Sequence, residues 1–428
     1  MTQPKIKINP IRNRRTTVPD AVLVLLLAGA FTWWRASRYE DGMVDLAVYR
    51  EAGRVVLGFA SAPDSLYAAE FGSNLPDYLP FTYPPFAALL FAPLAALPEM
   101  VGSTLFTAVS VAVLLGCVLY TARPLLGRVG VFAPVLAATL LGVAFLVEPS
   151  TMTLGLGQIN IVLMALCLAD CVARRPRWPS GLLIGIATAV KLTPGIFIIY
   201  LWITGRRTAA LTAAGTAAAC TGLGALLRPG DSVTFWTQAL FDAERLRDNS
   251  YYYNQSLRGV ALRVLPDGFD SVGWLCLVAL VAWFGLRRAR AAHERGDEIA
   301  AVAMVGLVAV LVSPVAWIHH ATWMVLALVI LVDVAVGEPE RRRSLLVLTA
   351  LVSAIFVAEL PQLGHNMRWS GGPDPISVPL ENLYAVTCLA VLLLLPIRSH
   401  PVRHLALSRM WERSNSGKGQ DGGLGGAG

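Results

Sequence analysis

The sequence has little charge for its length. Only 15% of its 428 residues are Asp, Glu, Lys or Arg, 55% are hydrophobic, and the mean hydropathy is +0.59. A soluble domain carries about 25% charged residues, so this shortage excludes a soluble globular body. Apolar stretches recur from residue 20 to residue 397, which excludes a single anchor on a soluble domain. The sequence therefore predicts an all-α polytopic membrane protein.

Other missing features exclude further classes of protein. The six cysteines form no CxxC pair, which argues against a disulfide framework or a cysteine metal site. No acidic cluster of DxD type occurs in the predicted outer loops, so we expect neither a metal nor another cofactor. No basic face with interleaved aromatic residues accompanies the net charge of +7, so nucleic acid is not an expected partner. Residues 21–36 lack a small-x-small cleavage site, which favours a retained span over a signal peptide.

The apolar stretches predict about twelve transmembrane helices. We place them at 20–35, 103–122, 131–147, 157–173, 180–190, 193–204, 208–227, 271–287, 299–313, 319–336, 345–360 and 381–397. The segment 180–204 is predicted to break at Lys191-Leu-Thr-Pro194. The alternative, one long helix kinked at the proline, would invert every later loop.

Basic residues favour the broken helix and place both termini in the cytoplasm. With this topology 24 of the 35 Lys and Arg residues lie inside, as the positive-inside rule requires. The chain then divides into a basic cytoplasmic N-terminus (1–19), a transmembrane domain (20–397) and a partly disordered cytoplasmic tail (398–428). The Lys and Arg bias also predicts which loops of this multi-pass membrane protein face outward.

The outer loops are longer and chemically richer than the inner ones. They span 36–102, 148–156, 191–192, 228–270, 313–318 and 361–380. The apolar stretch 84–98 is too short to cross a bilayer, and we expect it to form a re-entrant or interfacial helix on the outer side. Because function concentrates in such loops, the outer face is the predicted location of the chemistry.

The first outer loop contains a candidate general base. Asp45 opens the segment DLAVYREA (45–52), in which Asp45, Tyr49 and Ala52 share one face of a short amphipathic helix. A carboxylate at this place is suited to accept a proton from an attacking hydroxyl. The alternative is a helix N-terminal charge that only favours the dipole. The competing carboxylates are Glu40, Asp41 and Glu51.

Two cationic or titratable groups are candidates for contacting an anion. Lys191 lies alone at the outer helix break, against the positive-inside trend, and a phosphate is its natural partner. The alternative is a lysine that snorkels to the interface. SPVAWIHH (313–320) ends in His319 and His320, which point about 100° apart on a helix and so do not form a zinc pair. Hydrogen bonding to a phosphate or a sugar is the better hypothesis for them.

Aromatic and amide side chains form a third group of candidates, for binding sugar hydroxyls. They lie in FTYPP (81–85), LGQIN (156–160) and YYYNQSLRG (251–259). The alternatives are a helix start at the prolines, hydrogen bonds between helices, and a packed loop. The residues concerned are Tyr83, Gln158, Asn160, Asn254 and Gln255, with Arg258 as a phosphate contact.

In this order the motifs DLAVYREA, FTYPPFAALLFAPLAALP, LGQIN, KLTP, YNQSLRG and SPVAWIHH resemble glycosyltransferase family 87, over roughly residues 20–397. The resemblance implies the superfamily C glycosyltransferase (GT-C) fold with an active site facing the periplasm. It also implies an α-mannosyltransferase that takes mannose from a polyprenyl-phosphate-mannose donor. The implied acceptor is a lipid-linked mannan or a phosphatidylinositol mannoside, and an α-1,2 linkage is expected.

The resemblance also implies roles for the candidate residues. Asp45 matches an essential aspartate and would be the general base of an inverting displacement. Lys191, His319, His320 and Arg258 would neutralise the leaving phosphate. The sugar sites would be lined by Tyr49, Tyr83, Gln158, Asn160, Asn254 and Gln255.

Three alternatives remain open at this point. The same family contains arabinofuranosyltransferases that use decaprenyl-phosphate-arabinose and share the YPP-type turn. Among mannosyltransferases, overall likeness favours an enzyme that branches lipomannan over one that elongates phosphatidylinositol mannosides. A lipid or sugar transporter would require inverted repeats and paired broken helices, and the sequence contains one broken pair and no visible repeat.

Overall fold

The computed structural model describes residues 43–60, 62–68, 71, 79–173, 176–242, 248–266, 270–372 and 374–398. Every regular element in these ranges is helical, and one isolated antiparallel bridge joins Asn254 to Trp317. The predicted N-terminal segment 1–19, the span 20–35, Glu40 and Asp41 lie outside the described residues, as does the tail from 399 onward. An all-helical fold is what the sequence predicts.

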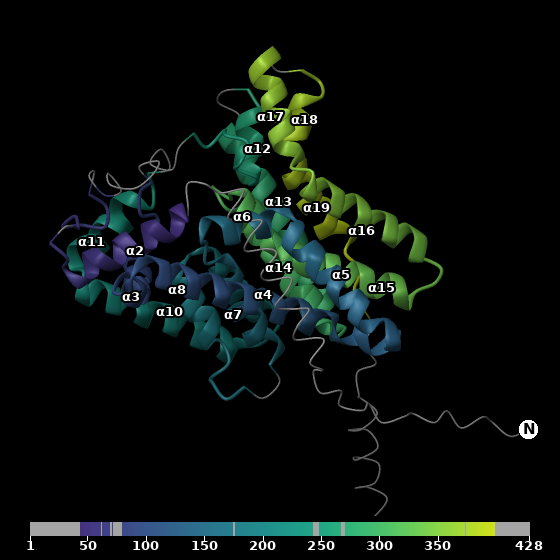
Figure 1. Ribbon diagram of the computed structural model, residues 1–428, viewed down its shortest axis with the longest axis horizontal. Helices are drawn as coiled ribbons and strands as arrows, with labels where there is room; N and C mark the ends of the chain where they lie inside the picture. Colours follow the sequence, from purple (N-terminus) through teal and green to yellow (C-terminus); the bar gives the residue numbers. More distant parts are fainter. Residues whose placement is uncertain are drawn as a thin grey trace, which may run out of the picture.

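The helices follow one another with short connections (Figure 1). The first half of the chain forms α2 (Val44–Leu57), α3 (Pro85–Ala95), α4 (Glu99–Val129), η2 (Gly130–Phe132), α5 (Ala133–Leu146), α6 (Glu148–Leu156), α7 (Asn160–Val172), α8 (Leu182–Val190), η3 (Thr193–Gly195), α9 (Ile196–Ile203) and α10 (Arg207–Leu227). The second half forms α11 (Pro229–Thr234), η4 (Phe235–Ala239), α12 (Leu257–Val264), α13 (Asp270–Glu294), α14 (Glu298–Val312), η6 (Ile318–Trp323), α15 (Met324–Gly337), α16 (Arg342–Val357), α17 (Leu360–Gly371), α18 (Ser377–Glu381) and α19 (Leu383–Leu394).

Each predicted span from 103–122 onward coincides with a helix, including the break at Lys191 between α8 and η3. Within the described ranges four helical segments are long and apolar enough to cross a membrane, or six if each of two bent pairs counts as one span. The four are Glu99–Leu146, Arg207–Leu227, Val272–Glu294 and Ile318–Gly337. A membrane protein is therefore confirmed at this coarser level, whereas the number twelve and the position of the termini remain predictions.

Burial separates central helices from peripheral ones. In α14 every residue from Ala300 to Leu311 is buried, and most of the span Ile318–Gly337 is buried as well. In α10 and α13, by contrast, large apolar side chains such as Leu211, Leu226 and Trp283 are exposed. Apolar faces of this size on outlying helices are suited to contact lipid.

The outer segment before α4 packs as a helix pair. Pro84 and Pro85 start α3 because proline fixes the backbone of a first helical turn. Gly53 allows close contact between α2 and α3, since a Cβ there would lie 2.7 Å from the Cβ of Ala95. The short helix predicted within 84–98 is thus confirmed. The segment from Asp45 is also helical, as predicted, and α2 buries most of its residues in the protein, among them Tyr49 and Ala52.

Several predicted outer loops contain helices. Residues 148–156, expected as a loop, form α6, which meets α7 at an angle of 114°. Gly157 makes this bend with φ +74°, and its missing side chain admits the Cβ of Leu46, which would lie 2.6 Å from a Cβ at position 157. The bend therefore brings the start of α2 against the start of α7. Loops 228–270 and 361–380 likewise contain α11, α12, α17 and α18, and α17 and α18 project at the top of Figure 1.

Candidate active site

The helix break after α8 places Lys191 among side chains of other helices. The Nζ atom of Lys191 donates a hydrogen bond to Oδ1 of Asn160 at 3.0 Å and lies 2.9 Å from Nε2 of His320. It also lies 5.4 Å from the centre of the Tyr83 ring. Lys191 thus points inward to α7 and η6, which argues against snorkelling. The break matters because it places Lys191 at the end of α8 and not inside a continuous helix.

The histidine pair is fixed through its backbone. The carbonyl oxygen of His319 accepts hydrogen bonds from Oγ1 of Thr153 at 3.0 Å and from Nδ2 of Asn160 at 3.1 Å. The two imidazole rings lie 4.7 Å apart at 82° to each other. His320 reaches Lys191, whereas His319 is 5% exposed and neither of its ring nitrogens has a partner within the described part of the chain. A buried imidazole in this condition has free hydrogen-bonding capacity for a ligand.

Two tyrosines and one glutamine form a hydrogen-bonded triangle beside this cluster. The hydroxyls of Tyr49 and Tyr83 lie 2.7 Å apart, and both donate to Oε1 of Gln158, at 2.8 and 3.1 Å. All three residues are buried, and Tyr49 also stacks on Phe91 at 4.2 Å between ring centres. The triangle joins α2, the YPP turn and the α6–α7 bend, which lie far apart in the sequence.

Asp45 lies at the first turn of α2, one helical turn before Tyr49. Its charge acts on several members of the cluster. Burial raises the pKa of Tyr83, and the charge of Asp45 raises it further. Burial lowers the pKa of Lys191 to about 7, and Asp45 acts in the opposite direction. The fold therefore brings Asp45, Tyr83 and Lys191 to the same part of the molecule.

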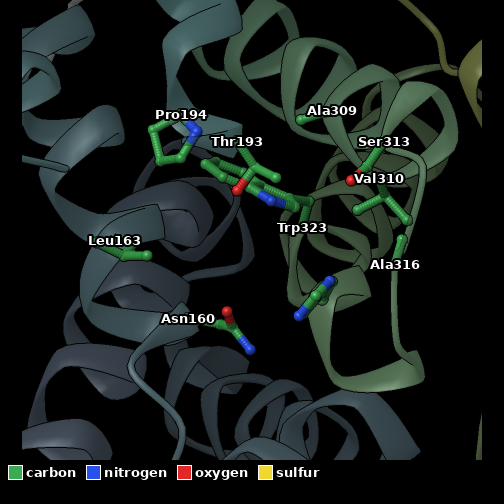
Figure 2. A pocket seen from close by; sticks show the side chains of 10 residues that line it. Asn160, Leu163, Thr193, Pro194, Ala309, Val310, Ser313, Ala316 and Trp323 are labelled. Atoms are coloured by element: carbon green, nitrogen blue, oxygen red, sulfur yellow. The ribbon is translucent and has the colours of Figure 1, made fainter. Parts of the chain in front are cut away.

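A pocket is lined by Asn160 and His320, the two hydrogen-bonding partners of Lys191. Figure 2 shows Asn160 and Leu163 on one side of it and Val310, Ser313 and Ala316 on the other. Most of its wall is apolar carbon, and its polar side chains include Asn160, Ser313 and His320. The remaining wall comes from Thr193, Pro194, Ala309 and Trp323.

Comparison with known proteins places this arrangement in a family. Residues 81–314 match the model of glycosyltransferase family 87. The chain belongs to that family. Family 87 membership confirms that the protein is a glycosyltransferase, as its sequence motifs predict. No solved structure matches the chain.

Three curated relatives of this family 87 protein carry similar names. A polyprenol-phosphate-mannose-dependent alpha-(1-2)-phosphatidylinositol mannoside mannosyltransferase of Mycolicibacterium smegmatis is 32% identical over 364 residues, which are 79% of this chain and 80% of the relative. A protein of the same name from Mycobacterium tuberculosis is 34% identical over 72% of this chain and 75% of its own. A Mycobacterium tuberculosis pentamannoside mannosyltransferase is 33% identical over 76% of each chain.

The remaining predicted residues lie before and in α12, and Asn254 and Gln255 bind the segment that leads into η6. Oδ1 of Asn254 accepts from the backbone N–H of Ala316 at 3.0 Å, and the Gln255 side chain bonds to backbone groups of Tyr252, Glu381 and Ala385. Both amides are therefore occupied by protein partners, and sugar binding by them stays a prediction. Arg258 stacks on the Trp274 ring at 5.2 Å. Among the residues that the structure describes, none of the three makes a hydrogen bond or ring contact with Lys191 or Tyr83, so a phosphate role for Arg258 also stays a prediction.

Sequence reasoning missed Thr153 and Trp323, which belong to this site of the family 87 protein. Thr153 lies in a segment expected as a loop, so its contact with the His319 carbonyl had no signal in the sequence. Trp323 looks like an ordinary apolar residue of a span, although it lines the pocket and fills the space above Gly306. Within the described ranges no group of three or more metal-ligating side chains occurs. Metal independence is an expectation that this observation does not test.

Proposed function

We propose that this family 87 protein transfers mannose from a polyprenyl-phosphate-mannose donor to a phosphatidylinositol mannoside and forms an α-1,2 linkage. The observation that carries the proposal is the environment of Lys191. Its ammonium is partly buried and donates hydrogen bonds to two neutral groups, the amide oxygen of Asn160 and Nε2 of the neutral His320 ring. An anionic ligand completes such a site. The names of the curated relatives supply the donor and the acceptor class.

Lys191 stabilises the leaving group. As the bond between the anomeric carbon and the phosphate oxygen breaks, negative charge grows on the lipid phosphate. A cation fixed in advance at that position lowers the barrier because it need not reorganise during the reaction. His320, held at 2.9 Å from Nζ, and the unpartnered ring of His319 supply further hydrogen bonds to the phosphate. Polyprenyl phosphate leaves without a protonating acid.

Asp45 acts as the general base. It accepts the proton of the acceptor hydroxyl while the oxygen attacks the anomeric carbon from the face opposite the phosphate. One base and a direct displacement invert the anomeric carbon, which turns a β-linked donor into an α-mannoside. The Tyr49–Tyr83–Gln158 triangle fixes the helix that carries Asp45 and lines the sugar site. The family 87 relatives' names favour this mannosyl chemistry over arabinose transfer.

The pocket beside Asn160 and His320 receives the first isoprene units of the donor. Its apolar walls, among them Leu163, Ala309 and Val310, suit a hydrocarbon. Asn160 and His320 also line it and bind Lys191, which connects the pocket to the phosphate site. The catalytic site faces the outside of the plasma membrane, as the distribution of basic residues predicts. The names of the relatives give no support to lipomannan as the acceptor, so a phosphatidylinositol mannoside is the acceptor we propose.

The decisive experiment is transfer of labelled mannose by the purified full chain in detergent. The assay uses a synthetic polyprenyl-phosphate-mannose and a phosphatidylinositol mannoside, with lipomannan as a second acceptor. We expect an α-1,2-linked product on the phosphatidylinositol mannoside. If the protein binds both lipids and transfers no mannose, the proposal is wrong. A preference for lipomannan would replace the acceptor and leave the donor chemistry intact.

A further inference from the structure

Both ends of the Asn160 amide are used by the protein. Oδ1 accepts the hydrogen bond from Nζ of Lys191 at 3.0 Å, and Nδ2 donates to the carbonyl oxygen of His319 at 3.1 Å. Asn160 is 7% exposed and opens α7 directly after the Gly157 bend. Since an amide oxygen cannot donate and an amide nitrogen cannot accept, these two contacts fix which way the side chain is turned. These two contacts use half of the four hydrogen-bonding positions of the amide.

Through these contacts one residue joins the two segments that hold the phosphate ligands. Lys191 follows α8, whereas His319 and His320 belong to η6, more than a hundred residues later. Thr153 binds the same His319 carbonyl at 3.0 Å, so the η6 turn stays attached to α6 through a second bond. Asn160 alone among the described residues binds both Lys191 and the η6 backbone. It therefore sets where the ammonium points relative to the histidines.

The electrostatic character of this contact matters as much as its geometry. An aspartate has nearly the same shape as asparagine and would also accept from Lys191. A carboxylate 3 Å from the ammonium would, however, satisfy the lysine with a full negative charge inside the protein. It would also repel the incoming phosphate and the His319 carbonyl oxygen. An amide holds the lysine and leaves its charge available to a ligand.

We propose that Asn160 is a positioning residue that aims Lys191 at the lipid phosphate without neutralising it. Asn160 acts through Lys191 and the His319 carbonyl rather than as a ligand of the sugar, in contrast to the sequence-based expectation. The inference rests on the proposed function, because it takes the anion at Lys191 to be the donor phosphate.

The test compares three variants of the full chain in detergent, with binding of a polyprenyl phosphate as the readout and the uncharged polyprenol as the reference ligand. Asn160→Asp keeps the shape and adds a charge, Asn160→Ala removes both contacts, and Thr153→Val removes the other bond to the His319 carbonyl without adding charge. We expect Asn160→Asp to weaken polyprenyl phosphate binding by at least about tenfold and more than Asn160→Ala. Thr153→Val should weaken it by about twofold to threefold. Polyprenol binding should change much less than polyprenyl phosphate binding in all three.

A purely structural role predicts the reverse order, because the near-isosteric Asn160→Asp disturbs packing less than Asn160→Ala. That order, or an equal loss of polyprenol binding, would overturn the inference. If Asn160→Asp shows no cooperative melting transition, Asn160→Ala decides: a selective loss of phosphate binding supports the positioning role, and an equal loss or none contradicts it. Wild-type protein that binds no polyprenyl phosphate would instead refute the proposed function.

Discussion

The two ends of the α14–α15 helix pair treat buried charge in opposite ways. At one end Asp297 and Asp333 are 1% exposed and bind Arg398, with Arg398 Nη2 2.5 Å from Asp297 Oδ1 and Nη1 2.8 Å from Asp333 Oδ2. Arg128 also pairs with Asp333. The helix α14 has 15 residues and is about 22 Å long. At its other end Lys191 makes hydrogen bonds to neutral groups and no ion pair within the described ranges.

This difference separates charges that hold the fold from charges that meet a ligand. The Arg398 network satisfies its own members, and removing Arg398 takes away the guanidinium that the two buried carboxylates share. Lys191 keeps capacity for an external anion, because no carboxylate among the described residues forms an ion pair with it and Asp45 acts on it only at longer range. Substitutions in the Arg398 network should therefore change stability, and substitutions at Lys191 should change activity.

The largest effect is expected from removing the base at the ligand-binding end. Asp45→Asn should lower kcat by about 10³-fold or more, because general base catalysis contributes on that scale. Donor binding and the melting temperature should remain near their wild-type values. Glu51→Gln, on the same helix, is the matched control, since Glu51 is bonded to Arg54. A comparable loss in Glu51→Gln, or a loss below about tenfold in Asp45→Asn, would place the base elsewhere.

Lys191→Ala should weaken donor binding by about 10²-fold, measured as KM and as competition by polyprenyl phosphate. The melting temperature should stay within a small shift of wild type because no ion pair is lost. A large drop in stability with unchanged donor affinity would show that Lys191 holds the fold, as Arg398 does, and does not bind the donor. That outcome would remove the contrast between the two ends.

Arg398→Ala should do the opposite. It leaves Asp297 and Asp333 without their common partner and should cost about 3 kcal/mol of stability, visible as a lower melting temperature. KM for the donor in the folded fraction should not change. Arg290→Ala, which breaks only the exposed pair with Glu294, is the control and should cost at most about 0.5 kcal/mol. Equal effects of the two substitutions would contradict the structural role of the buried network.

The pH dependence sharpens the role of Lys191. Burial lowers its pKa to about 7, so the free enzyme loses the ammonium as the pH rises through that value. Donor kcat/KM should consequently fall about tenfold per pH unit above about 7. Lys191→Arg keeps the charge at higher pH and should flatten this limb of the profile. An unchanged alkaline limb in Lys191→Arg would assign the titration to another group.

The smallest effect is expected in the pocket. Ala309→Phe adds bulk to the apolar wall and should raise KM for a long-chain donor several-fold, with kcat little changed. Leu211→Phe, on an exposed face of α10, is the control and should leave KM unchanged. If the increase in KM is the same for a donor with a truncated lipid, the pocket does not receive the isoprene chain.

Much of the helical layout could be predicted from the sequence. Apolar stretches and the Lys191-Leu-Thr-Pro194 break mark helix positions because length and proline act locally. Predictions failed where a helix is short or polar: α6 was expected as a loop because Glu148-Pro-Ser-Thr lacks an apolar repeat. The helix α6 forms because it packs against η6 and because the chain bends at Gly157.

The candidate residues also divide into those that could be recognised from the sequence and those that could not. Asp45, Lys191 and His320 were identifiable because a charge or titratable group in an apolar sequence is costly without a purpose. The roles of Asn160, Asn254 and Gln255 were not identifiable, since an amide looks the same in a sequence whether it binds a sugar or a backbone group. Only their partners in space distinguish the two cases.

The sequence by itself determined that this is a helical membrane protein of glycosyltransferase family 87 and which charged side chains are costly enough to need a partner. These properties follow from hydropathy, motif order and the free-energy cost of a charge in an apolar medium. Only the tertiary structure decided which charges satisfy one another and which do not. Arg398 and Lys191 both follow an apolar stretch in the sequence. Long-range packing gives Arg398 two carboxylates as partners and gives Lys191 an amide and an imidazole.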